Sequence, residues 1–335
     1  MALLALAGVE ARADDWPYQA ECRKFANVAI PQRDIGVAPA KCDSNILYYG
    51  ATGDGHGSDF VASRACAYRE RAAKEDVEFS GAMILTMIYA NGLGVQRNLP
   101  LAKRFSCELD GAPAEMEGRL VHLDSIASKG SGKQRFDICD DITSGFMMGW
   151  CSAHEADFAK VRRDERMRAL SRTWTPAQQS AFASLRKSAD VYFDASAQGE
   201  IDLSGTARGM YETVARESLE EGFLAAIERF EKGNRPEPGA TGFKSEDAGL
   251  NAAYKARLTE IAEAEKDGDQ GTGAVTATGV REAQRKWLIY REAWVSFGAA
   301  RYPAVPADAW RSWLSHERAA KIRNPEPDME APASH

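Results

Sequence analysis

The chain has 335 residues, of which 44% are hydrophobic and 27% are charged, so it is long enough for two or three domains with real hydrophobic cores. Its formal net charge of −7 argues against nucleic acid or an anionic membrane surface as the main partner. No stretch approaches the roughly twenty apolar residues that a transmembrane helix needs, so membrane insertion is not expected.

The first residues have the pattern of a secretory signal peptide. A short apolar run is followed by Ala11-x-Ala13, a typical cleavage signature, although the positively charged start of such a peptide is missing. We therefore assign residues 1–13 to a residual signal peptide and expect the mature protein to begin near Asp14. The protein should then be periplasmic or secreted.

Six cysteines, all in the first half of the chain, support export. They are Cys22, Cys42, Cys66, Cys107, Cys139 and Cys151. An even number of cysteines in an exported chain favours disulfides, but the sequence alone leaves their connectivity open. We prefer a Cys22–Cys42 bridge, which would clip an N-terminal arm that three prolines interrupt. A metal site built from Cys139 and Cys151-x-x-His154 lacks a fourth ligand and is disfavoured.

Residues 82–105 carry the pattern of a short helical hairpin. Leu85 and Tyr89 share one face of the first helix, Gly92 and Gly94 permit a tight left-handed turn, and Phe105 returns on the second helix. The pattern resembles a Sel-like repeat, the short-looped relative of the tetratricopeptide repeat. Because about three repeats are usually needed for a stable solenoid, this segment must lean on its neighbours or on a disulfide.

The Sel-like resemblance also suggests a second bridge. A partial copy upstream of the hairpin would place Cys66 and Cys107 on neighbouring, parallel second helices, so we expect them to pair. The segment would serve either as a structural spacer or as a protein-binding groove.

Further helices are expected through the middle of the chain. Thr143 or Ser144 can cap a helix that runs through Cys151, and Thr175-Pro176 supplies a cap followed by proline at the first helical position. The expected helices after Cys151 span about 152–172, 176–198 and 206–232. A hinge rich in glycine and proline then follows.

Two amphipathic helices with polar side chains beside aromatic ones mark the C-terminal third. Leu250 and Tyr254 share one face, and Trp287, Tyr290, Trp294 and Phe297 form the apolar stripe of the second helix. Unpaired polar groups beside such aromatics would cost a few kcal/mol. We therefore expect four polar side chains to satisfy one another across the two facing helices: Asp247, Asn251, Gln284 and Arg291.

This paired pattern, which ends in Leu314-Ser315-x-x-Arg318, resembles the lysozyme-inhibitor LprI-like family of small helical modules in secreted and periplasmic bacterial proteins. The signature residues that carry the resemblance are Asp247, Leu250, Asn251, Tyr254, Gln284, Trp287, Tyr290, Arg291 and Arg318. Two cysteines that are usual in the family are replaced by Trp294 and Trp310. The family typically opens with a cysteine clip, which implies a Cys139–Cys151 bridge here.

The run Phe182-x-x-Leu185-Arg186 echoes Trp287-x-x-Tyr290-Arg291, so we interpret an earlier segment as a diverged copy of the module. The fold class expected is all-α, with a short Sel-like hairpin segment followed by two antiparallel helical modules. The divisions are an arm and Sel-like segment over 14–127, modules over 136–232 and 246–322, a linker over 233–245 and a disordered tail over 323–335.

The sequence contains no motif that indicates catalysis. The histidines form no metal or triad spacing, and no nucleophile elbow, zinc-protease or nucleotide-loop motif occurs. Acid pairs such as Glu220-Glu221 are expected on solvated helix faces, and His316 is expected to cap or cross-link the last helix. We therefore expect a non-enzymatic protein with no cofactor and no metal.

The resemblance implies a protein partner, a lysozyme or another envelope protein, whose basic cleft an acidic helical surface would occlude. The alternative is a periplasmic scaffold that binds an envelope or secretion-system protein through the Sel-like segment.

Overall fold

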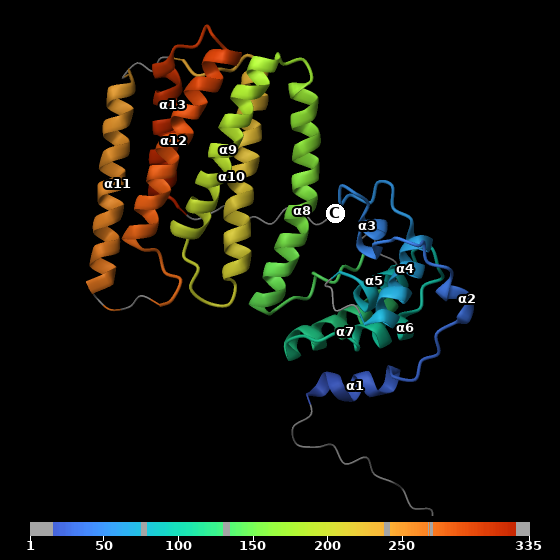
Figure 1. Ribbon diagram of the computed structural model, residues 1–335. Coiled ribbons are helices and arrows are strands. Elements are labelled where there is room, and N and C mark those ends of the chain that lie inside the picture. Colours follow the sequence, from blue (N-terminus) through green and yellow to red (C-terminus); the bar gives the residue numbers. More distant parts are fainter. Residues whose placement is uncertain are drawn as a thin grey trace, which may run out of the picture. The chain divides into compact units, whose positions relative to one another are not determined.

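The computed structural model describes residues 16–74, 79–129, 135–237, 242–266, 268 and 271–325. All regular structure in these ranges is α-helical, as expected from the sequence (Figure 1). The chain divides into two compact units, residues 1–147 and residues 148–335. The expected signal peptide and most of the expected tail lie outside the described residues.

The first unit contains seven helices in its described part. They are α1 (Pro17–Phe25), α2 (Gln32–Ile35), α3 (Ser44–Tyr49), α4 (Phe60–Ala73), α5 (Gly81–Asn91), α6 (Leu99–Ser106) and α7 (Pro113–Lys129). Asp43, Asp59 and Asn98 cap three of them by accepting hydrogen bonds from backbone N–H groups of the first turn. Helices α4, α5, α6 and α7 pack one against the next in chain order.

Helices α5 and α6 span the hairpin expected over residues 82–105 and pack together. Gly92 and Gly94 have φ values of 69° and 62°, the left-handed region that the turn requires. A Cβ atom at Gly94 would also lie 3.0 Å from the Cβ of Phe60. Glycine is therefore needed at this turn both for its backbone freedom and for its missing side chain.

Two of the three disulfide pairings predicted from the sequence, Cys22–Cys42 and Cys66–Cys107, are wrong. Cys22 pairs with Cys107 and Cys42 pairs with Cys66, with Cα–Cα distances of 5.5 and 6.1 Å. The physical reason is packing: α1 lies on α6 and α7, which brings Cys22 to the end of α6. Cys139 and Cys151 are disulfide-bonded as well, and the described residues contain no free cysteine.

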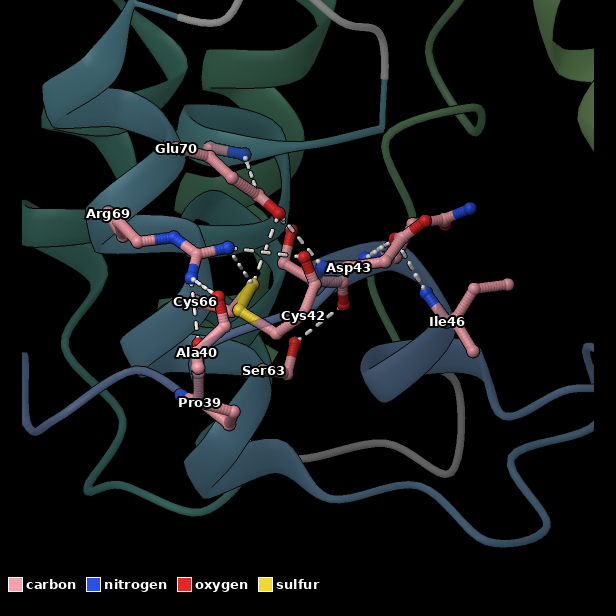
Figure 2. Close-up of a disulfide and its surroundings, with 12 residues drawn as sticks. Pro39, Ala40, Cys42, Asp43, Ile46, Ser63, Cys66, Arg69 and Glu70 are labelled. Carbon is pink, nitrogen blue, oxygen red and sulfur yellow. Dashed lines mark hydrogen bonds between the residues drawn. A yellow bond between two sulfur atoms is a disulfide. The ribbon is translucent and has the colours of Figure 1, made fainter.

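The side chains around the Cys42–Cys66 bridge explain why Cys66 meets the segment before α3 (Figure 2). The buried carboxylate of Glu70 accepts hydrogen bonds from the backbone N–H of Ser44 and of Gly81, both at 3.0 Å, at the starts of α3 and α5. The Arg69 guanidinium donates to three backbone carbonyls of residues 39–42. Charge-assisted bonds of this kind hold the segment against α4.

The second unit contains six long helices in its described part. They are α8 (Gly145–Ser171, which starts just before the boundary), α9 (Pro176–Gly199), α10 (Arg208–Glu231), α11 (Gly242–Lys266), α12 (Ala277–Arg301) and α13 (Ala307–Arg323). Ser144 caps α8, and α8 is continuous where two helices were expected on either side of Cys151. Thr175 and Gln178 form the capping box of α9, with Pro176 at the first position as expected.

Helix α9 runs antiparallel along α12, since Gly199 meets Gly279 at one end and Gln178 bonds to the Ala300 carbonyl at the other (Figure 1). Helix α10 packs on α9, and α11 packs mainly along α13 rather than along α12. The two segments interpreted as separate modules thus contribute α9 and α12 to the most extensive helix pair of this unit.

A cluster of aromatic side chains forms the core of the second unit. The rings of Trp294 and Trp310 stack with centroids 6.0 Å apart, and Phe230 meets both edge-on. A Cβ atom at Gly298 would lie 2.5 Å from the Trp310 indole, so this ring needs a glycine beside it. Buried side chains from residues 174–230 and from residues 250–322 therefore form one shared core, whereas residues 136–147 belong to the first unit.

Candidate functional site

The signature residues lie on α11, α12 and α13, and their apolar members are buried or half-buried as expected. Leu250, Trp287 and Tyr290 are buried in the core, and Tyr254 packs against its edge. The expected apolar stripe of α12 is confirmed, because Trp294 and Phe297 are also fully buried.

The polar signature residues do not all satisfy one another across α11 and α12. Arg291 of α12 donates to Asp247 of α11 at 3.0 Å, as expected. Asn251 instead donates to Asp247 within α11 and is exposed, and Gln284 accepts from Arg318 of α13 at 3.0 Å. The expectation was wrong for these two residues because α11 packs mainly along α13 and leaves Asn251 facing solvent.

Arg318 is the centre of a buried polar network. Its guanidinium donates to the Glu200 carboxylate and to the Tyr192 hydroxyl, at 2.9 and 3.1 Å from the same nitrogen, and Ser196 donates to Glu200 at 2.7 Å. The Arg318 side chain is 0% exposed and the Glu200 side chain 7%. Burial acts to lower the pKa of Arg318, but Tyr192 and Glu200 outweigh it and raise the pKa above its usual value.

This network ties α13 to the end of α9 and to α12. Sequence reasoning missed Glu200 and Tyr192, since nothing in their spacing links them to Arg318 more than one hundred residues later. Because Arg318, Glu200 and Tyr192 are buried, the network acts as a structural cross-link between these helices.

Two of the described histidines pair with acidic side chains. His122 lies 2.9 Å from Asp141 and His316 lies 3.2 Å from Glu246, so His316 cross-links α13 to α11 as expected. Burial lowers the pKa of His154 to about 4. Among the described residues, no group of histidine, cysteine and acidic side chains has the geometry to hold a metal ion.

A cavity of about 600 Å³ lies between α8, α9 and α10 in the second unit. Its origin is the way α8 packs. At Gly149 and Gly209 the backbones of α8 and α10 approach closely, whereas farther along the two helices are joined by Arg163 and Arg166, which reach Glu217 and Glu228. These two ion pairs link α8 to α10, and Arg163 and Glu217 also line the cavity.

The cavity is lined by both apolar and charged side chains. The apolar ones include Phe182, Phe223 and Leu224. Among the charged ones, Arg186 makes two hydrogen bonds to the carboxylate of Glu220, at 2.5 and 2.6 Å, and its guanidinium lies 5.6 Å from the centre of the Phe223 ring. Both charges and apolar surface are therefore presented to one ligand-sized space.

The expectation that Glu220 lies on a solvated helix face was wrong. It is 6% exposed and pairs with Arg186 of α9 and Arg216 of its own helix. Its i+3 and i+4 neighbours Phe223 and Leu224 are buried, and this helical spacing was a signal that Glu220 shares the inner face. Glu221, by contrast, is half exposed.

A smaller cavity of about 470 Å³ lies where α10 and the segment after it meet α11 and α13. Arg229 lies over the Trp313 ring there, 5.7 Å from its centre.

None of the helices in the described parts of the chain is long and apolar enough to cross a bilayer. No protein-family model matches the chain, and no curated protein or solved structure matches it either.

Proposed function

We propose that the protein is an exported, non-enzymatic interaction protein that binds a lysozyme or another cell-wall hydrolase and occludes its active site. This proposal is based on the resemblance of the C-terminal helices to the LprI-like family. Disulfide bonding of all six cysteines is consistent with an oxidising compartment such as the periplasm or the extracellular space. The net charge of −7 suits a basic partner.

The observation that carries the proposal is that the polar signature residues bond to one another inside the helical unit. Asp247 pairs with Arg291 and Gln284 pairs with Arg318, so these side chains brace α11, α12 and α13. A helical unit braced in this way is suited to inhibition by occlusion, because little conformational freedom is lost on binding.

Titration of the purified mature protein into a turnover assay of a lysozyme tests the proposal. The rate should fall in a saturable manner and recover as salt is raised, because attraction between an acidic and a basic surface is screened. An unchanged rate at large molar excess of the protein would remove inhibition of that enzyme.

A second candidate function is a periplasmic scaffold that binds an envelope or secretion-system protein through the Sel-like segment, which lies in the first unit. It is favoured by two large apolar side chains on that unit's surface, Val37 and Val61, which are 94% and 56% exposed. Affinity capture with the full-length protein and with a Val37→Lys/Val61→Lys variant distinguishes the two. Partners lost only in the variant would support the scaffold.

A further inference from the structure

The cavity between α8, α9 and α10 has the size and lining of a binding groove. Its volume of about 600 Å³ lies within the range of roughly 300–1,000 Å³ that is usual for ligand-binding pockets. The apolar part of the lining includes Phe182 and Met167, which are only partly buried, and α8 contributes two small side chains, Ala153 and Ala156. Small side chains near partly exposed apolar ones leave room for an apolar side chain of a partner.

The cations that line the groove are already engaged. Arg163 makes paired hydrogen bonds to Glu217, Arg186 makes them to Glu220, and Arg216 lies 3.2 Å from Glu220. Lys160 pairs with Asp164, one turn along α8. An anionic ligand would have to break these charge-assisted contacts, so the groove does not select for one.

The carboxylates, in contrast, are in excess. Six carboxylates and four cations line the cavity, so its formal charge is negative. Among the described residues, none of the four cations pairs with Asp157 or with Glu212, which face the groove from α8 and α10. Glu212 accepts one hydrogen bond, from the amide of Gln198 at 3.0 Å. These two carboxylates can each receive a cation.

The geometry points to a docking groove for a basic and apolar peptide segment of the partner protein. In this arrangement an apolar side chain of the partner lies on Phe182 and Met167, and a neighbouring lysine or arginine reaches Asp157 or Glu212. The inference rests on the proposed function, because it identifies the surface through which the protein would hold a basic partner.

Two short peptides test the groove directly on the full-length protein. The probes are acetyl-Leu-Lys-Leu-Lys-Leu-amide and its glutamate counterpart, acetyl-Leu-Glu-Leu-Glu-Leu-amide, each titrated by calorimetry. The lysine peptide should bind and the glutamate peptide should not. An Asp157→Lys/Glu212→Lys variant should bind the lysine peptide about tenfold more weakly, because two attractive charges become repulsive.

A matched control carries the same change in net charge elsewhere. Glu263→Lys/Glu317→Lys reverses two exposed carboxylates on α11 and α13 and should leave the affinity for the lysine peptide within about twofold, since these sites lie outside the groove. A second pair of variants tests the shape of the groove without changing charge. Ala156→Phe should abolish binding by filling the cavity, whereas Ala264→Phe, at an exposed position of α11, should not.

Three outcomes would overturn the inference: preference for the glutamate peptide, equal loss of affinity in the Glu263→Lys/Glu317→Lys control, or a concentration-dependent dimer of the unliganded protein that Ala156→Phe abolishes. The lysozyme assay separates this failure from failure of the proposed function. If lysozyme is inhibited equally by the wild-type and groove variants, the function stands and the groove is wrong. If the lysine peptide binds as described but lysozyme is unaffected, the groove stands and lysozyme is not the partner.

Discussion

Removal of the charge of Arg318 should destabilise the second unit more than removal of any partly exposed arginine. Arg318→Met leaves the Glu200 carboxylate, whose side chain is 7% exposed, without its cationic partner. Breaking a buried ion pair by removing one member typically costs about 3–5 kcal/mol, because the remaining charge stays buried and uncompensated. The hydrogen bonds to Tyr192 and Gln284 are lost as well.

The matched control is Arg311→Met. Arg311 pairs with Glu292 at 2.8 Å, but the two side chains are 28% and 45% exposed, so water can replace the interaction. A pair of this kind contributes about 0–1 kcal/mol. The double variant Arg318→Met/Glu200→Met should recover much of the stability lost in the single variant, since no buried charge then remains.

Urea unfolding followed by tryptophan fluorescence measures these differences in the free energy of unfolding. All the tryptophans except Trp16 lie in the second unit, so the signal reports on that unit. A loss below about 1 kcal/mol for Arg318→Met, equal to that of the control, would refute the interpretation of the network as a buried cross-link.

Three further predictions concern stability. Gly298→Ala should cost about 1–3 kcal/mol in thermal or urea unfolding, because the added methyl group overlaps the Trp310 ring. The Arg166 guanidinium lowers the pKa of Glu228 below 4.5, so the unfolded state binds a proton at a higher pH than the folded state does. The free energy of unfolding should therefore fall as the pH drops below about 4.5, and it should fall less steeply in Arg166→Gln. The Cys22–Cys107 bridge spans 85 residues and the Cys42–Cys66 bridge spans 24. Removal of the Cys22–Cys107 bridge should therefore cost about 1 kcal/mol more than removal of the Cys42–Cys66 bridge on loop entropy alone. Urea unfolding of serine variants measures this difference.

Local patterns predicted most of the helices well. The cap and proline at Thr175-Pro176 mark the start of α9, and the spacing of Trp287, Tyr290 and Trp294 gives the buried face of α12. Such signals lie within a few turns of one helix and depend little on the rest of the chain. The predictions made from these signals hold in the structure because tertiary packing did not oppose them.

Long-range pairing could not be predicted in the same way. Cys66 was assigned to the wrong partner because the contact of α1 with α6 decides which thiols meet, and no local pattern encodes that contact. The Arg318–Glu200 pair and the cavity beside α8 arise from packing between distant helices as well. Each of these depends on which helices become neighbours, and the helical period alone does not specify that.

Hydrogen exchange of the full-length protein with and without saturating lysozyme is the most direct test of partner binding through the second unit. Exchange of backbone amides should slow in α8 and in the first half of α10, on both sides of the cavity, and stay unchanged in α11. Identical exchange throughout the protein in the presence of lysozyme would contradict the proposed function, and protection confined to α11 and α13 would place the contact on a different surface.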